Sequence, residues 1–283
     1  MRWQMGRRSE NVEDMRGSGG MMRGGMKMGC GTILLVIIIS VIFRQNPLQL
    51  LNMLSGGGGV QMEVPDSYQP TAEENQAADF VSVMLADMED TWPGLLQSMG
   101  RQYEPPKLVL FSNMVQSACG YGEAASGPFY CPGDQKVYID LSFFNELQRL
   151  GAPGDFAQAY VIAHEVGHHV QNLLGISDKV SQMQSRGGEA EANALSVMLE
   201  LQADCFAGVW AYHANQQRQM LEPGDVEEGL RAAASIGDDR LMRMSGRAVQ
   251  PESFTHGTSE QRVKWLRTGL STGDCDACNT FKR

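Results

Sequence analysis

The chain has 283 residues, of which 42% are hydrophobic and 20% charged, and its formal net charge is −10 at pH 7. This length is ample for one large domain or two small ones with a buried core. The charge is uneven, because the part from Asn46 onward carries 16 basic and 30 acidic residues. Nucleic-acid binding depends on basic surface, so this balance argues against a nucleic-acid partner for the main body.

The first 44 residues contain an Arg-rich stretch followed by an apolar run. Residues 1–28 are rich in Gly, Met and Arg without a helical or strand period, which predicts a disordered, basic cytoplasmic tail. Residues 29–44 are uncharged up to Arg44, a length slightly short for a spanning helix, so a secretory signal and a buried strand are alternatives. No small-x-small cleavage site follows, and we therefore expect an uncleaved single-pass transmembrane anchor.

The charges on either side of the apolar run predict its orientation. Six basic residues precede it, whereas none follows Arg44 before Arg101. The positive-inside rule then places the N-terminus in the cytoplasm and the remaining chain outside, in the periplasm or at the cell surface. The expected location is the inner (cell) membrane, with the main domain extracytoplasmic.

Residues 45–66 include four consecutive glycines and predict a flexible Gly-rich linker, after which a folded domain is expected over residues 67–283. Residues 71–74 are typical of a capping box that opens a helix, and the Trp-Pro-Gly sequence at 92–94 is expected to break it. The expected elements are a helix from Thr71 to about Met88, strands over 107–111 and 136–141, a short helix over 142–150, and longer helices over 155–174, 188–217 and about 259–270.

The helix expected over 155–174 contains the sequence His-Glu-Val-Gly-His at 164–168. Residues four apart share a helix face, so His164 and His168 can bind one zinc ion. Glu165 points elsewhere on the helix and can instead reach a metal-bound water. The alternative is a buried helix with two hydrogen-bonded histidines, but this spacing with an interposed Glu rarely arises by accident.

A third ligand is expected from the helix over 188–217. Glu200 and Asp204 are again four residues apart, and their neighbours are apolar. Carboxylates in such surroundings are costly unless they are paired or bind a metal. We expect Glu200 to be the third ligand and Asp204 to accept a hydrogen bond from His164, as in carboxylate–histidine–zinc arrangements. The alternative is a solvated acidic stripe.

Hydrolysis at this centre requires a base and a group that stabilises the oxyanion. Zinc lowers the pKa of its bound water towards about 7, and Glu165 would accept the proton as the water attacks a carbonyl. His256 precedes a helix capped by Thr258 or Ser259 and could reach the oxyanion, with Arg262 bracing the site. A loop histidine beside a surface helix is an equally good interpretation of this segment.

The cysteines predict disulfides in an extracytoplasmic domain. Cys119 and Cys131 are separated by eleven residues in a loop-rich stretch, where a disulfide is expected. One C-x-x-C, at Cys275 and Cys278, has too few ligands for a second metal site. A disulfide that joins the C-terminal tail to Cys205, or lies within the tail, is favoured, and one cysteine must stay unpaired.

Three motifs together resemble the bacterial putative neutral zinc metallopeptidase family: HEVGHHVQ at 164–171, LELQADC at 199–205 and HGTSEQR at 256–262. That family is similar in turn to minimal gluzincins. The resemblance implies a predominantly α, α+β domain with a small sheet. It also implies one Zn²⁺ on His164, His168 and Glu200, with Glu165 as the general base. By the same analogy, the strand around 137–139 is expected to be a sheet edge that binds an extended peptide.

The favoured function is a membrane-anchored zinc endopeptidase that hydrolyses polypeptides. A non-catalytic envelope scaffold held together by zinc is a second hypothesis, although a structural zinc site usually has four protein ligands rather than three. A zinc amidase that acts on cell-wall cross-links is a third. Zinc is the expected metal because two imidazoles, a carboxylate and an open position suit it.

Overall fold

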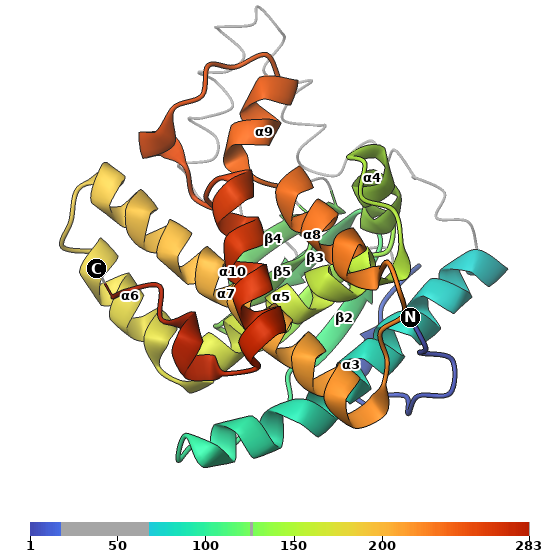
Figure 1. The fold of residues 1–283 in the computed structure, drawn as a ribbon. Helices are drawn as coiled ribbons and strands as arrows, with labels where there is room; N and C mark the ends of the chain where they lie inside the picture. Colours follow the sequence, from blue (N-terminus) through green and yellow to red (C-terminus); the bar gives the residue numbers. More distant parts are fainter. Residues whose placement is uncertain (18–67, 125–126, 283) are drawn as a thin grey trace, which may run out of the picture. The chain divides into compact units, whose positions relative to one another are not determined.

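The structure, a computed structural model, describes residues 1–17, 68–124 and 127–282. The predicted anchor at 29–44 and the linker at 45–66 lie outside the described residues. The elements are β1 (Val12–Asp14), α3 (Ala72–Ser98), β2 (Lys107–Phe111), β3 (Met114–Ser117), β4 (Gly120–Glu123), β5 (Phe129–Cys131), β6 (Lys136–Asp140), α4 (Phe143–Arg149), α5 (Asp155–Leu173), α6 (Ile176–Gln184), α7 (Glu189–Arg218), α8 (Asp225–Ser235), α9 (Asp238–Met244), η2 (Pro251–Ser253), α10 (Ser259–Thr272) and η3 (Cys275–Cys278) (Figure 1). The predicted class, α+β and predominantly α, is confirmed.

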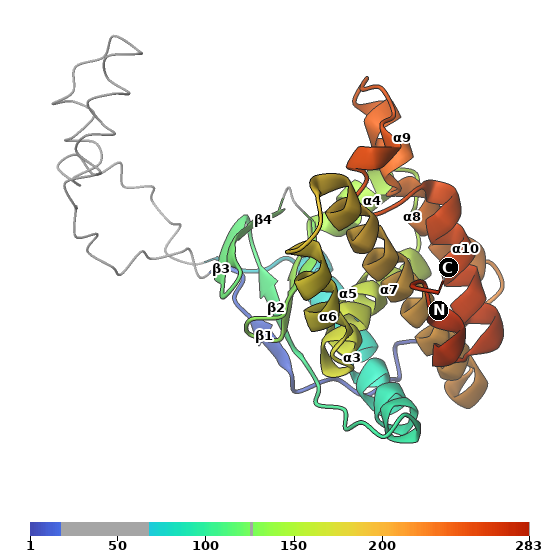
Figure 2. The ribbon, with the colours of Figure 1, turned by 90° about the vertical axis from the view of Figure 1, so that its left-hand side faces the viewer.

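Four strands form the main sheet in the order β1-β2-β6-β5, and β3 and β4 form a separate hairpin. Strands β1, β2 and β6 are parallel, whereas β5 runs antiparallel to β6. Alternate residues point to opposite faces of the sheet. Leu108 and Leu110 therefore join the helical core, while Val109 and Phe111 pack in a smaller core with Val115 of the hairpin. In Figure 2 this hairpin stands on the side of the sheet away from the helices.

Helix α7 packs against both α5 and α10, and these three helices position the functional residues described below. A Cβ atom at Gly167 of α5 would lie 3.1 Å from the Ala203 carbonyl oxygen of α7, so any larger residue would have to push the two helices slightly apart. The crossing of α7 and α10 is closer still, because a Cβ at Gly208 or Gly269 would overlap the backbone of the other helix. The backbone spacing of these helices is therefore set by three glycines.

Helix α3 contradicts the prediction that residues 92–94 break it, since it continues through Pro93 to Ser98. Proline inside a helix removes a backbone hydrogen bond and costs about 3 kcal/mol. Burial of the neighbouring residues offsets that cost: Trp92 and Leu96 are fully buried, and the Trp92 ring packs edge-on against Phe206 at 5.7 Å. Tertiary packing here outweighs the tendency of a proline to end a helix.

The first 16 residues are folded, so the predicted disordered tail is wrong for this part of the chain. The Trp3 ring is 6% exposed, packs edge-on against Phe80 at 5.2 Å and donates a hydrogen bond to Asp155. Strand β1 adds to the sheet in register with β2, Val12 opposite Leu108. A three-residue strand and isolated apolar anchors leave no periodic pattern, which is why the sequence alone did not reveal them.

The predicted orientation in the membrane also requires correction. Residues Met1–Arg16 and Pro70–Arg283 form one compact unit with a shared sheet and core. Segments that share a core occupy one compartment, so a cytoplasmic N-terminus and an extracytoplasmic main domain cannot both hold. Among the described residues, α7 alone is long and apolar enough to cross a membrane, but 61% of its most apolar window is buried inside the protein, as in a core helix.

Candidate metal centre

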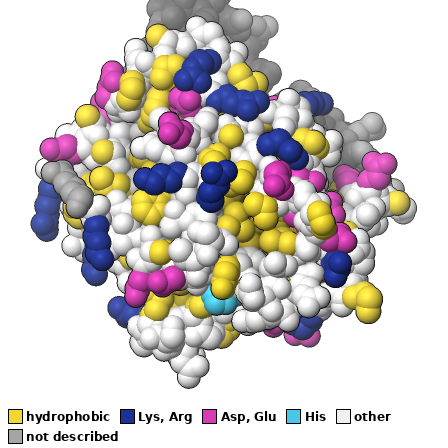
Figure 3. Space-filling model, viewed as in Figure 1, with side chains coloured by type: hydrophobic (Ala, Val, Ile, Leu, Met, Phe, Trp, Pro, Cys, Tyr) yellow, Lys and Arg dark blue, Asp and Glu magenta, His cyan; other side chains and the backbone are white. Residues whose placement is uncertain are grey.

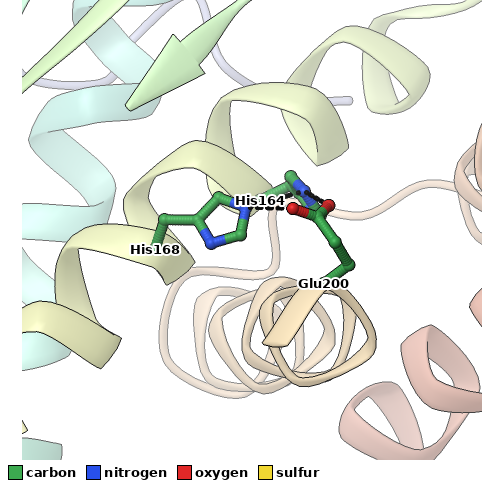
Figure 4. Close-up of side chains that lie close together, drawn as sticks. All are labelled: His164, His168 and Glu200. Atoms are coloured by element: carbon green, nitrogen blue, oxygen red, sulfur yellow. Dashed lines mark hydrogen bonds and ion pairs between the residues drawn. The ribbon is translucent and has the colours of Figure 1, made fainter. Parts of the chain in front are cut away.

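Helices α5 and α7 bring three potential metal ligands together. The Nε2 atoms of His164 and His168 lie 3.2 Å apart. The Glu200 carboxylate reaches both rings, with one oxygen 3.1 Å from His164 Nε2 and the other 3.3 Å from His168 Nε2. Figure 4 shows the two imidazoles and the carboxylate pointing toward one another between the helices.

The spacing of these donor atoms fits a zinc ion. Ligands of a tetrahedral zinc with bonds of roughly 2.0–2.1 Å lie about 3.3–3.4 Å apart, close to the separations found here. Two neutral imidazoles and one carboxylate are also a donor set that zinc enzymes use at sites with an open position. His164, His168 and Glu200 are the one such group of His, Cys, Asp and Glu among the residues that the structure describes.

The three groups stabilise one another's charged forms. Burial opposes the charged form of His164, but the Asp204 and Glu200 carboxylates outweigh burial and raise its pKa to about 10. Burial likewise acts to raise the pKa of Glu200, yet the two imidazoles lower it well below the usual value. A bound cation would replace the protons that the imidazoles share with Glu200, so we expect metal binding to release protons.

Asp204 orients the His164 ring through Nδ1, the nitrogen that does not face the other two candidate ligands. Its Oδ1 atom lies 2.8 Å from His164 Nδ1 and accepts a hydrogen bond from the Tyr160 hydroxyl at 2.5 Å. Arg262 of α10 donates to both Asp204 oxygens at 2.9 Å. Asp204 is fully buried and Arg262 is 2% exposed, so the ion pair is screened from solvent. Burial acts to raise the pKa of Asp204, but Arg262 and His164 lower it to about 2. From the sequence, Asp204 and Arg262 were placed near the metal ligands, but Tyr160 was not identified.

A cavity of about 670 Å³ lies beside the three ligands. Glu165 lines this cavity and is 7% exposed, directly after the first histidine. The wall also includes apolar side chains of α4, α5, α7 and α9 and the loops that border them: Phe143, Leu150, Val161, Leu199, Ile236 and Leu241. The site therefore combines a metal-binding set, a buried carboxylate and an apolar wall.

The sheet edge at this cavity is β5, not the strand around 137–139. That strand lies inside β6, which is paired with β2 on one side and with β5 on the other. The prediction of a peptide-binding edge there is wrong, because β6 has no unpaired side. Phe129 and Tyr130 of β5, with Pro128 just before it, line the cavity instead.

His256 lies on the loop before α10 and lines the same cavity. Its Nδ1 atom is 3.1 Å from Asp238 Oδ1, and its side chain is 51% exposed. Asp238 also accepts hydrogen bonds from the backbone N–H groups of Thr255, His256 and Gly257, which fixes the loop. The sequence did not identify Asp238, which is 18 residues away from its histidine and has no motif of its own.

His169 lies outside the group formed by His164, His168 and Glu200. Its ring nitrogens lie 3.1 Å from the Tyr130 hydroxyl and 2.6 Å from the Glu104 carbonyl oxygen. It therefore joins α5 to β5.

The expected Cys119–Cys131 disulfide is present, and of the two alternatives left open for the C-terminal tail the structure has the disulfide to Cys205. Cys119 joins Cys131, which ties the β3–β4 hairpin to β5, and Cys205 joins Cys278. Cys275 is a free thiol, and burial raises its pKa to about 12.

Comparisons with known proteins point to a zinc metallopeptidase family, which is consistent with a zinc-binding group of residues. A family model described as "Putative neutral zinc metallopeptidase" matches residues 1–281. The Escherichia coli K12 protein "Uncharacterized protein YpfJ" is 51% identical over 99% of each chain. An uncharacterized protein of Mycobacterium tuberculosis H37Rv is 42% identical over 69% of this chain and 67% of its own length. No solved structure matches the chain.

Proposed function

Because the chain belongs to the putative neutral zinc metallopeptidase family, we propose that it is a zinc-dependent endopeptidase with His164, His168 and Glu200 as the metal ligands. The observation that carries the proposal is the convergence of two imidazole Nε2 atoms and the Glu200 carboxylate, 3.1–3.3 Å apart, at the wall of a cavity that Glu165 also lines. A scaffold role would leave the cavity and the buried Glu165 without a purpose. A structural zinc would also be expected to have four protein ligands.

The residues of this chain divide the work of hydrolysis. A zinc ion held by the three ligands would act as a Lewis acid that polarises a carbonyl group and acidifies water. Glu165 is the general base that accepts a proton from the attacking water. The imidazole of His256, held through Nδ1 by Asp238, lines the cavity and would stabilise the developing oxyanion by hydrogen bonding.

The substrate is an extended polypeptide that pairs with the open edge of β5. Strand addition supplies main-chain hydrogen bonds without selecting particular side chains. Apolar side chains of the substrate would then lie against the wall formed by Leu199, Ile236 and Leu241. Polypeptide also suits the surface better than nucleic acid does, since on the face in Figure 3 basic side chains lie among acidic and apolar ones and the chain is acidic overall.

The disulfides and the apolar run favour a membrane-attached enzyme outside the cytoplasm. Two disulfides are typical of an oxidising compartment. Residues 29–44 provide the apolar stretch that would attach the protein to the membrane without a single pass across it, since the segments before and after it share one core.

Glu165→Gln in the full-length protein, purified in detergent, tests the proposal. The amide keeps the shape of the side chain but cannot accept a proton, so one equivalent of zinc should be retained while cleavage of a denatured protein substrate is abolished. Peptidoglycan fragments assayed in parallel test the amidase hypothesis. If wild-type protein binds zinc and cleaves neither substrate, the endopeptidase proposal is contradicted and the scaffold is favoured.

A further inference from the structure

The Nδ1 atoms of His164 and His168, which point away from the proposed metal position, have different partners. His164 Nδ1 faces the Asp204 carboxylate, whereas His168 Nδ1 lies 2.9 Å from the side-chain oxygen of Gln171. Gln171 is one helical turn further along α5 and is fully buried. An amide oxygen can only accept here, so His168 carries a proton on Nδ1, and Nε2 is the atom that it would offer to a metal ion.

The Gln171 amide is itself held in one orientation. Its Nε2 donates to the Leu199 carbonyl oxygen at 2.7 Å and to the side-chain oxygen of Gln202 at 3.2 Å. Leu199 directly precedes Glu200, so one amide connects the second histidine to the helix turn that carries the third ligand. With both donor hydrogens used, the amide cannot rotate without leaving buried groups unsatisfied.

The chain of hydrogen bonds ends at a disulfide. Gln202 is 5% exposed and donates to the carbonyl oxygen of Cys278 at 3.0 Å. Cys278 is bonded to Cys205, which directly follows Asp204 in α7. The same disulfide therefore lies next to the hydrogen-bond partners of both histidines. Asp204, which contacts His164, is adjacent to Cys205 in the chain. Gln202, which accepts a hydrogen bond from Gln171, the partner of His168, donates one to Cys278.

We propose that Gln171 is a positioning residue for the metal centre, and that the Cys205–Cys278 disulfide maintains its orientation by fixing the turn that Gln202 contacts. The proposal rests on the proposed zinc site but not on the identity of the substrate. It predicts that the strength of zinc binding depends on a disulfide whose sulfur atoms do not contact the metal. Loss of supports of this kind typically weakens metal affinity about 10–100-fold.

Isosteric substitutions test the hydrogen bonds without opening a cavity. Gln171→Met and Gln202→Met keep the side-chain length and remove the polar atoms. In full-length protein, zinc dissociation constants from competition with a chelator should rise about 10–100-fold for Gln171→Met and less for Gln202→Met. At saturating Co²⁺, the visible absorption bands of Gln171→Met should also shift, which a general loss of stability would not cause.

The matched control is Gln184→Met. Gln184 is a half-buried glutamine of α6 that bonds to Ala192 and Ser196 and lies outside the metal centre. Its zinc affinity should stay within about twofold of wild type. An unchanged dissociation constant for Gln171→Met, or an equal change for Gln184→Met, would overturn the positioning role.

The disulfide is tested against the other cystine of the same chain. Cys205→Ala/Cys278→Ala should weaken zinc binding about tenfold, whereas Cys119→Ala/Cys131→Ala should not change it. Equal zinc affinity in the two double variants would refute the link between the disulfide and the metal centre. If wild-type protein binds zinc without cleaving protein, the proposed activity fails while these affinity comparisons still decide the positioning role.

Discussion

Arg262 connects the metal centre to the helical core through a buried ion pair. Removing one partner of such a pair leaves an uncompensated charge and costs about 3–5 kcal/mol. Arg262→Met should lower the free energy of unfolding of the metal-free protein by about that amount, because Asp204 would remain buried beside Tyr160. Urea denaturation in the presence of EDTA measures the loss.

The control for this variant is Arg267→Met on the same helix. Arg267 is exposed, so its substitution should change stability by less than about 0.5 kcal/mol. If the two variants are equally stable, the Arg262–Asp204 pair does not support the centre.

His256 should affect turnover without affecting the metal. Loss of one oxyanion donor typically lowers kcat about 10²–10³-fold, so His256→Ala should show a decrease of that order with full zinc content. His213→Ala is the comparison, because His213 interacts with the Gly273 carbonyl oxygen at the far end of α7. Peptidase assays with both variants decide the point, and an unchanged kcat for His256→Ala would exclude it from the reaction.

The residues of the metal centre differ in how well the sequence alone predicted them. His164, Glu165 and His168 were predicted as site residues because ligand geometry imposes a fixed spacing on one helix. Glu200 and Asp204 were identified because carboxylates among apolar neighbours need a partner, and the structure places both beside His164. Tyr160 and Asp238 contact residues of other elements, Asp204 and His256, and a local sequence pattern does not predict such contacts.

At the scale of elements, the crossing of α7 and α10 determines where Arg262 lies. Gly269→Ala should destabilise the protein by at least about 1–3 kcal/mol, since the added methyl overlaps the backbone at Cys205 and forces the helices apart. Gly94→Ala is the matched control, because its methyl group meets nothing within 4 Å and alanine favours a helix by about 1 kcal/mol. Thermal unfolding of the two variants should therefore shift in opposite directions, and a neutral Gly269→Ala would contradict the close packing.

The elements themselves followed the sequence where a pattern was long enough. Helices α5, α7 and α10 begin and end within about two residues of their predicted limits, and β2 and β6 within one. Helices α6, α8 and α9, the end of α3 and the place of β5 at the sheet edge were missed. Burial of Trp92 stabilises α3 beyond Pro93. The three residues of β5 are too few to show the alternation of polar and apolar residues that predicts a strand.

At the scale of the whole molecule, the N-terminal segment and the metal centre should occupy the same side of the membrane. Met5 is fully exposed on the N-terminal segment and Tyr121 is 65% exposed on the β3–β4 hairpin. In a Cys30→Ala/Cys275→Ala background, Met5→Cys and Tyr121→Cys should react equally with a membrane-impermeant maleimide in intact cells. Labelling of position 5 only after permeabilisation would contradict the shared core.

The pairing of β1 with β2 also sets the order in which the sheet can be completed. Val12 is synthesised 96 residues before its partner Leu108. At about 5–20 residues per second, that delay is roughly 5–20 s, during which the first strand has no template. When β2 emerges, its outer edge stays open until the start of the chain returns to cover it, and an open edge invites pairing with other chains. The nascent chain is therefore most prone to aggregate in the interval before its first residues dock.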